Sequence, residues 1–359
     1  MMASDRDRGT PLTDSVLRAE IAEQPDVLRR LLRESASDVS RVAECLRAHP
    51  VRHVVIAARG SSDNAARYAQ YLFGAYNRLV VSLATPSLFT RYHAAPRMDG
   101  ALVTGVSQSG ESPDLVAVVA EGRRQGCQTL AITNVADSPL AKAAHHVILL
   151  RAGREQSIAA TKTYTAQLTA LAMLSTELAQ DEARQRELAR VPEFVASAAG
   201  VDDAIVVAAA ETLRGAGHGV VLGRGFNFAT AFELALKAKE LAHVAVEPYS
   251  SADFQHGPIA LIETGFAAIV INVAGAVSGE VDLLLADISK RGTRPVVLSN
   301  LRSSLDLAAA PIALPGDMPE WVSPIAAIVP GQLLAFHLSR IRGLDPDSPR
   351  GLKKVTKTT

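Results

Sequence analysis

The sequence predicts an α/β fold of two tandem domains, each a doubly wound parallel sheet flanked by helices, and three observations predict it. The chain has 359 residues, which is enough for two domains of ordinary size. From Val51 onward, short runs rich in Val, Ile and Leu alternate with Ala-rich helical stretches, as in parallel sheets covered on both faces. The pattern then repeats, with glycines recurring at a constant distance.

The first expected elements are a disordered lead at residues 1–13 and an amphipathic helical region. Its apolar residues recur at helical spacing and are Val16, Leu17, Ile21, Leu28, Leu31 and Leu32. Four strands follow in the segments HVVIAARG, ALVTGVSQSG, TLAITN and HHVILLRAG. After a helical stretch over residues 163–195, four more are expected in GVVLGRG, FAAIVINVAG, RPVVLSN and PIALPG.

The two series of strands are copies of each other. Gly60, Gly100 and Gly110 recur at one constant offset as Gly225, Gly265 and Gly275, and Gly126 and Asn134 recur at nearly the same offset as Gly292 and Asn300. Matches at the same places of strand–turn–helix units indicate an internal duplication. We therefore expect a lead and N-terminal helix over 1–39, domains over 40–195 and 205–340, and a tail over 341–359 that closes the active site.

Composition excludes several classes of protein. The 37 basic and 37 acidic residues cancel, which favours a small-molecule partner over nucleic acid or a membrane surface. Cys45 and Cys127 lack the spacing of a disulfide framework or a zinc site. The N-terminus lacks the apolar core of a signal peptide, and the longest apolar run, Gly265 to Val277, is too short to span a bilayer. We expect a cytoplasmic protein.

Two hydroxyl-rich turns follow strands in the first half: Ser61 and Ser62 in RGSSD, and Ser107, Gln108, Ser109 and Ser112 in SQSGES. Ligands of open α/β sheets bind beyond the carboxyl ends of the strands, where a helix N-terminus attracts phosphate. The alternative is that these serines are ordinary N-caps. Because the matching turn of the second half, residues 272–277, has lost its run of hydroxyls, we expect one phosphate site, in the first half.

Further polar residues stand out in the second half and the tail. Glu233, Lys237 and Glu240 fall on one helix face, which is either functional or a solvated face with an ion pair. His256 lies in a turn before Gly-Pro, where a lone histidine is usually structural. The tail carries Lys353 and Lys354, whose plain interpretation is a solubilising basic end.

Taken together, these segments resemble the sugar isomerase (SIS) superfamily. The chain is similar to the isomerase half of glucosamine-6-phosphate synthase, and more so to the type II glucosamine-6-phosphate deaminases. The resemblance runs from about Gly60 to the C-terminus, through SQSGESPD, AATK at 159–162, LGRG with ALKAKE, HGP and PRGLKKVT. The family's tandem SIS domains agree with the duplication.

The resemblance implies a set of site residues. Those expected to bind the sugar phosphate are Ser61, Ser62, Ser107, Gln108, Ser109 and Ser112, with Lys353 and the backbone of Ile158 and Ala160. Glu240 would be the base that moves a proton between C1 and C2, and Lys237 would help set its charge state. His256, reaching in from the neighbouring subunit of a homodimer, would open the sugar ring. Lys354 would contact the open-chain carbonyl end, where the synthases can form a Schiff base.

This chemistry needs no metal and no redox cofactor, and it releases ammonia when water hydrolyses the imine. A glutamine-dependent synthase uses an N-terminal cysteine, whereas the first cysteine here is Cys45, so we expect a deaminase. Ala160 and Gln255 resemble the deaminases, because the synthases carry serine and lysine there. Asp253 replaces the usual glutamate and leaves other amino-sugar phosphates open.

Two alternatives stay open. One is a related SIS enzyme that isomerises, deaminates or aminates another amino-sugar phosphate. The other is a non-catalytic phosphosugar sensor, since SIS domains also occur in transcriptional regulators. Those regulators usually add a helix-turn-helix, for which the stretch before the first strand is too short, and they would not need Glu240, His256 and Lys354 together.

Overall fold

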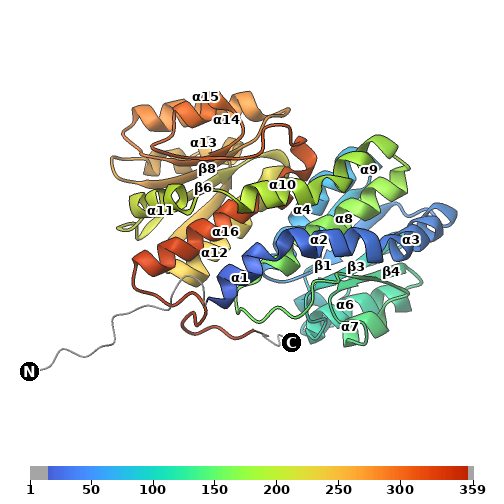
Figure 1. Ribbon diagram of the computed structural model, residues 1–359. Coiled ribbons are helices and arrows are strands. Elements are labelled where there is room, and N and C mark those ends of the chain that lie inside the picture. The colour runs from blue at the N-terminus through green and yellow to red at the C-terminus, as the bar shows by residue number, and fades with distance from the viewer. Residues whose placement is uncertain (1–14, 355–359) are drawn as a thin grey trace, which may run out of the picture.

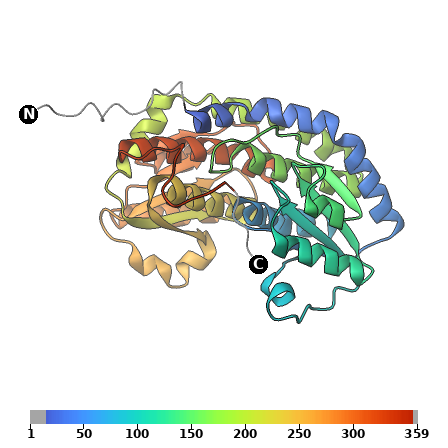
Figure 2. The same ribbon diagram turned by 90° about the horizontal axis from the view of Figure 1, so that it is seen from below.

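The computed structural model describes residues 15–354. The lead expected at residues 1–13 lies outside the described residues, as does the end of the tail. The helical region predicted near the N-terminus forms three helices, α1 (Val16–Ala22), α2 (Gln24–Glu34) and α3 (Ala36–Ala48). They run along one side of the molecule (blue in Figure 2).

The first domain holds a five-stranded parallel sheet in the order β2-β1-β3-β4-β5. Its strands are β1 (His53–Ala57), β2 (Val80–Leu83), β3 (Ala101–Ser107), β4 (Gln128–Thr133) and β5 (His146–Leu149). The helices between them are α4 (Ser61–Asn77), α5 (Ser87–Thr90), α6 (Pro113–Arg124) and α7 (Pro139–Ala143). Every residue of β3 is buried, as expected of a central strand covered on both faces.

The second domain repeats this topology, with the order β10-β9-β8-β6-β7. Its strands are β6 (His218–Gly223), β7 (Ala245–Ser250), β8 (Ala267–Asn272), β9 (Val296–Ser299) and β10 (Ala310–Ala313). Its helical segments are η2 (Gly225–Asn227), α12 (Phe228–Ala242), α13 (Ser251–Gln255), η3 (Pro258–Leu261), α14 (Ser278–Lys290) and α15 (Arg302–Asp306). The predicted α/β fold with a duplicated, doubly wound parallel-sheet domain is confirmed (Figure 1).

The remaining helices join the two halves. They are α8 (Lys162–Ala179), α9 (Glu182–Ala189), α10 (Val191–Ala199), α11 (Asp203–Thr212), η4 (Glu320–Val322) and α16 (Ser323–Ile341). Helix α4 of the first domain packs on α12 of the second, and α10 packs on both α2 and α16. One hydrophobic core therefore contains Tyr68 and Phe73 from the first half together with Trp321 and Phe336 from the second.

The expectation that Gly265 to Val277 is the longest apolar run of the chain is wrong. Among the described residues, Glu320–Ile341 is long and apolar enough to cross a membrane, with 22 residues and a mean hydropathy of 1.4. Scattered polar residues such as Gln332 and His337 interrupt the run without lowering that mean much. The apolar window is wholly buried inside the protein, so α16 is a core helix around which both domains pack.

Candidate active site

The turn after β3 is shaped by its own hydroxyls. Ser107 Oγ accepts a hydrogen bond from the Gly110 N–H at 3.0 Å, and Ser109 Oγ accepts one from the Glu111 N–H at 3.3 Å. Gly110 has a φ of 66°, and a Cβ there would lie 2.3 Å from Ser138 Oγ, so the turn requires glycine. Ser112 precedes α6 but makes no capping hydrogen bond, which argues against the N-cap interpretation at that serine.

The turn before α4 lies beside it, because β1 and β3 are adjacent and parallel. Gly60, with a φ of 54°, is the N-cap, and neither following serine caps the helix. Ser62 Oγ accepts from Gln167 Nε2 at 2.9 Å, while Ser61 Oγ donates to Glu233 Oε1 at 2.8 Å. Ser61 therefore links the two domains and is not an open phosphate donor in this structure.

The acidic and basic residues of α12 form a buried cluster. Glu233 and Lys237 are 0% and 1% exposed, which rules out the solvated face considered from the sequence. Lys237 Nζ lies 3.4 Å from Glu233 Oε1 and 2.5 Å from Glu240 Oε2. Asn64 Nδ2 of α4 donates to the second oxygen of Glu233 at 2.8 Å.

The charges of this cluster perturb one another. Burial raises the pKa of Glu233, which the nearby Lys237 ammonium and the Asn64 hydrogen bond only partly oppose. Burial lowers the pKa of Lys237, but the carboxylates of Glu233, Glu240 and Glu155 outweigh it, so the pKa is raised overall. Lys237 is thus held as a cation among carboxylates at the domain interface.

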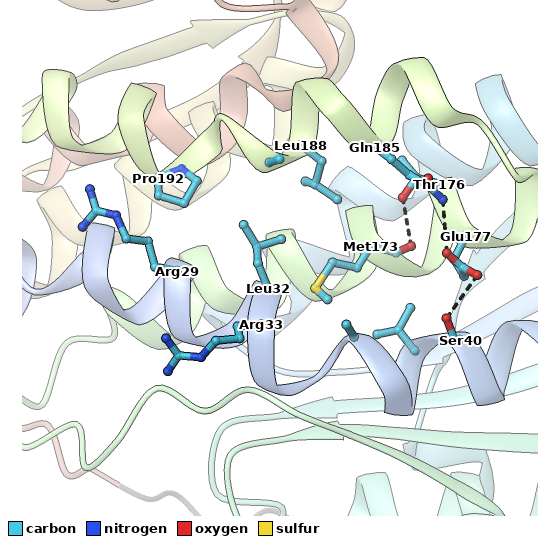
Figure 3. Close-up of a pocket in the computed structure, with 13 residues that line it drawn as sticks. Arg29, Leu32, Arg33, Ser40, Met173, Thr176, Glu177, Gln185, Leu188 and Pro192 are labelled. Atoms are coloured by element: carbon cyan, nitrogen blue, oxygen red, sulfur yellow. Dashed lines mark hydrogen bonds between the residues drawn. The ribbon is translucent and has the colours of Figure 1, made fainter.

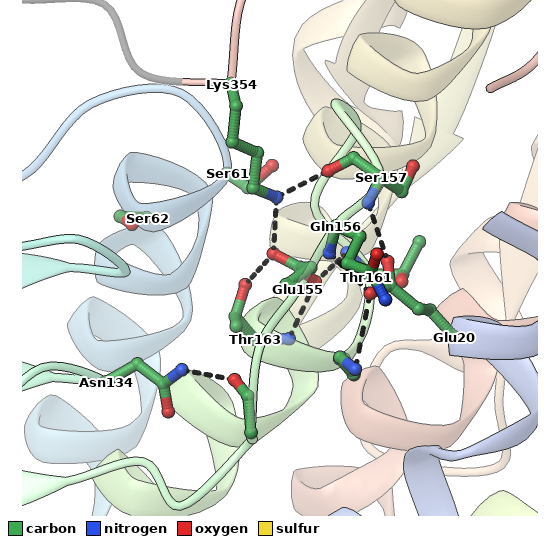
Figure 4. A network of polar contacts seen from close by, with 12 residues as sticks. Glu20, Ser61, Ser62, Asn134, Glu155, Gln156, Ser157, Thr161, Thr163 and Lys354 are labelled. Carbon is green, nitrogen blue, oxygen red and sulfur yellow. Dashed lines mark hydrogen bonds and ion pairs between the residues drawn. The ribbon is translucent and has the colours of Figure 1, made fainter. Parts of the chain in front are cut away.

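A second buried carboxylate, Glu155, holds the tail in place. Its Oε1 accepts from the backbone N–H groups of Thr161 and Thr163 at 2.9 and 3.2 Å, and its Oε2 accepts from Thr163 Oγ1 at 2.6 Å. Lys354 Nζ donates to Glu155 Oε2 at 3.0 Å and to the Ser157 carbonyl at 2.6 Å (Figure 4). Lys354 therefore pairs with a buried carboxylate and is not a free solubilising end.

A pocket of about 600 Å³ joins the turn after β3 to the Glu155–Lys354 pair, since Gln108, Ser109, Glu155 and Lys354 line it, whereas no residue of α12 does. Arg30, Arg151 and Arg154 line it as well, so its wall is rich in positive charge that suits a phosphate. Another pocket, of about 520 Å³, lies among α2, α3, α8 and α9 and is largely apolar (Figure 3). It contains none of the residues predicted for the site.

Two predicted residues stand apart from this cluster. His256 is exposed at the end of α13 and makes no side-chain hydrogen bond with any described residue. Lys353 is exposed, and it has no hydrogen bond or ion pair within the described chain. Ile158 and Ala160 lie in the loop that Glu155 and Lys354 hold, both half-buried. No group of three His, Cys, Asp or Glu residues within residues 15–354 could hold a metal ion.

The sequence patterns do not predict a role for Asn64 or Glu155, and for Glu233 they predict only a shared helix face with Lys237. The signal for Asn64 was present, since it follows the RGSSD turn directly. Glu155 is a single acid in a loop, and no spacing marks it. Its importance depends on Lys354, which lies 199 residues further along the chain.

Residues 49–176 and 212–341 match the family model of the SIS domain, so the chain belongs to the SIS-domain family. It is 34% identical over 345 residues to the isomerizing glutamine–fructose-6-phosphate aminotransferase of Thermococcus kodakarensis, a match that covers 93% of this chain and 56% of that protein. The chain thus spans little more than half the length of this curated relative.

Solved structures of similar proteins have the same fold as this chain. A Silicibacter pomeroyi protein assigned as a phosphosugar isomerase has a TM-score of 0.84 at 33% identity, covering 93% of this chain and all of that one. The C-terminal domain of the glucosamine-fructose-6-phosphate aminotransferase of Francisella tularensis has a TM-score of 0.85 at 26% identity, covering 96% of this chain and 100% of that one. The glucosamine-6-phosphate deaminase of Thermotoga maritima, at 22% identity, a TM-score of 0.75 and coverages of 96% and 100%, shows the shared fold alone.

Proposed function

We propose that this protein is a glucosamine-6-phosphate deaminase, which converts glucosamine 6-phosphate and water to fructose 6-phosphate and ammonia. The observation that carries the proposal is the buried cluster of Glu233, Lys237 and Glu240 beside the Glu155–Lys354 pair. Moving a hydrogen between adjacent carbons requires one base that reaches both, in a site that holds its charge state. Glu240 is the partly exposed acid of the cluster and can meet a substrate, whereas Glu233 is sealed.

The turn after β3 would bind the phosphate. Gln108 and Ser109 line the pocket, and the Ser112 hydroxyl is not used as a helix cap. Backbone N–H groups at the start of α6 and the arginine-rich wall favour an anion there. The backbone of Ile158 and Ala160 and the Ser62 hydroxyl complete the phosphate site in this proposal.

In the proposed reaction, each of these groups has a separate role. His256 of the neighbouring subunit protonates the ring oxygen and opens the sugar. Glu240 takes the proton from C2 and returns it to C1, which converts the 2-amino aldose into a 2-imino ketose. Lys354, fixed by Glu155, contacts the carbonyl end and orients the open chain. Water adds to the imine at C2, and ammonia leaves with the proton it gains.

A second candidate function is the same reaction in the opposite direction. The 34% identity to an aminotransferase favours the reverse process, amination of fructose 6-phosphate, with ammonia as the nitrogen donor in this site. The residues Ala160 and Gln255 support deamination, since they match the deaminase pattern and not that of the synthases. Another amino-sugar phosphate and a non-catalytic sensor are the remaining alternatives, the former because Asp253 replaces a glutamate.

The deciding experiment incubates the purified protein with glucosamine 6-phosphate and follows ammonia and fructose 6-phosphate together. Equal release of both is expected from the parent protein. Glu240→Gln should abolish turnover and keep phosphosugar binding, because the amide preserves shape and removes the base. If the parent protein binds the phosphosugar and forms no product, a sensor is supported. If Glu240→Gln loses phosphosugar binding as well as turnover, the role of Glu240 as the base is contradicted. Faster formation of glucosamine 6-phosphate from fructose 6-phosphate and ammonia would support the second candidate.

A further inference from the structure

The second domain contains its own version of the phosphate-binding turn. Gly225 and Gly275 occupy the places of Gly60 and Gly110 in the repeat, at the same offset along the chain. Strands β6 and β8 are adjacent and parallel, like β1 and β3, so the two turns again meet at one edge of a sheet. Residues 273–277 have lost the serines. In this turn the Ala274 N–H donates to Asn300 Oδ1 at 2.8 Å, and the start of α14 at Val277 has no side-chain cap.

The carboxylate of Glu320 fills this turn. Glu320 Oε2 accepts a hydrogen bond from the Ala276 N–H at 2.9 Å. A Cβ added to Gly275 would lie 2.1 Å from the same oxygen, and one added to Gly225 would lie 3.4 Å from Oε1. The carboxylate therefore lies between both glycine turns, at the place where the first domain is proposed to bind phosphate. A side chain at Gly275 would meet this carboxylate, so Glu320 would have to move to accommodate it.

The corresponding acid of the first domain, Glu155, does not occupy the turn of its own domain. Asn134 and Asn300 each donate through Nδ2 to a glycine carbonyl, Gly153 at 2.6 Å and Gly316 at 3.4 Å, so the loops after β5 and β10 are held alike. Glu155 lies two residues after Gly153 and Glu320 lies four residues after Gly316, and the two acids are separated by the same offset as Gly110 and Gly275. Glu155 binds Thr163 and Lys354 and leaves the turn after β3 open to the pocket.

We infer that Glu320 is an internal substitute for a bound phosphate, and that the second domain retains an anion site which its own side chain occupies. Helix N-termini and turns with free N–H groups attract anions, and a carboxylate carried by the same chain is present at high effective concentration. The vacated site would take a phosphate monoester or inorganic phosphate. The inference goes beyond the proposed function and accounts for a single phosphosugar site in a chain with two such domains.

The test removes the carboxylate and offers inorganic phosphate. Equilibrium dialysis should show one more phosphate bound per chain of Glu320→Ala than of the parent, and thermal denaturation should show a larger stabilisation by phosphate than by chloride at equal ionic strength. In Glu320→Ala with Gly275→Ala, the added methyl group occupies the vacated space, so the extra phosphate should be lost. Because the readout is the difference between variant and parent, it is independent of turnover and of the first site.

Two results would overturn the inference. One is a folded Glu320→Ala variant that binds no more phosphate than the parent does. The other concerns a variant that folds poorly: if the internal anion is needed for folding, phosphate should restore the soluble yield of Glu320→Ala, and a yield no better in phosphate than in chloride contradicts the idea. Glu320→Gln is the control: its amide has the volume of the carboxylate and keeps one acceptor oxygen, so it still fills the site. This variant should bind no extra phosphate.

Discussion

Lys237 is a buried cation whose charge is compensated by neighbouring carboxylates. A fully buried ammonium is costly, and the cost is offset here because Glu233 and Glu240 lie within ion-pair distance. Glu233 in turn depends on Ser61 and Asn64 of the first domain for its remaining hydrogen bonds. The cluster is therefore a structural contact between the domains as well as a set of candidate catalytic groups.

Replacing Lys237 by methionine should destabilise the protein by about 3–5 kcal/mol, because Glu233 would stay buried without its counter-charge. Adding Glu233→Gln should recover a large part of that loss, since no uncompensated charge would remain in the interior. The measurement is denaturant unfolding of the two single variants and the double variant. The exposed Lys239→Met on the same helix is the control and should change stability by less than about 0.5 kcal/mol. Additive losses in the double variant would contradict the coupling.

His337 should make the protein less stable in mild acid. It is 4% exposed on α16, and burial lowers its pKa, as do Arg18 and Arg340, against the raising effect of Asp203 at 3.3 Å. Between that lowered pKa and the ordinary value near 6.5, the unfolded chain binds more protons than the folded one. The free energy of unfolding therefore falls as pH falls through this window, by up to about 1.4 kcal/mol per pH unit.

The check is to measure the free energy of unfolding of His337→Asn from neutral to mildly acidic pH. The dependence of the unfolding free energy on pH should become less steep, by the equivalent of up to one bound proton. Part of the dependence should remain, because the pKa values of His145 and His146 are lowered as well. An unchanged slope in His337→Asn would show that His337 does not contribute.

At the residue scale, local spacing predicts some site residues and cannot predict others. Glu233, Lys237 and Glu240 are visible because they share one helical face. Glu155 is not visible in this way, and Asn64 is marked only by its place after the RGSSD turn. Their partners lie 199 and 169 residues away, and only the return of the tail and the packing of α4 on α12 bring them together. Burial of the cluster is likewise a consequence of tertiary packing.

At the scale of elements, α1 links the tail to the loop that carries Ile158 and Ala160. The carboxylate of Asp347 accepts from the N–H groups of Val16 and Leu17 at 3.2 and 2.7 Å, which satisfies the start of the helix. Glu20 of α1 accepts from the N–H groups of Gln156 and Ser157 at 2.6 and 3.1 Å. The amphipathic pattern predicts this helix but shows neither contact, because both depend on distant segments.

Asp347→Ala should loosen the tail and lower kcat by about tenfold to a hundredfold with a smaller change in KM, because Lys354 would be misplaced while the phosphate site is intact. Steady-state kinetics measure this split, and faster trypsin cleavage at Arg350 and Lys353 reports the loosened tail without reference to activity. Asp345→Ala should have a much weaker effect, because the Asp345 carboxylate accepts from the Asp347 N–H and, among the described residues, has no hydrogen bond to α1. Unchanged cleavage would contradict the anchoring role.

At the scale of the whole molecule, the glycine repeat predicts the duplication of the sheet, and the observed strand orders are the same when each is followed from its β2 or β7 edge. The expectation of four strands in each domain is wrong, because each sheet has a fifth strand, β2 or β7, at its edge. These edge strands are partly exposed and so lack the continuous apolar run by which the other strands are recognised. The repeat does not predict how the halves pack, since α4, α12 and α16 contact through side chains that differ between the copies. It also does not predict how His256, which is exposed directly after α13 and has no side-chain partner among the described residues, reaches a substrate. The proposal supplies it from a second subunit.

Heterodimers of defined composition test that proposal. If Glu240 and His256 of different chains form one site, a heterodimer of Glu240→Gln and His256→Ala chains, isolated with two affinity tags, has one complete site. It should show about half the parent activity, although both homodimers are nearly inactive. The reciprocal heterodimer, with both substitutions on one chain and a parent partner, has no complete site and should be inactive. A half-active reciprocal heterodimer with an inactive first one would place His256 in its own chain's site, and failure to isolate any heterodimer would contradict the dimer itself.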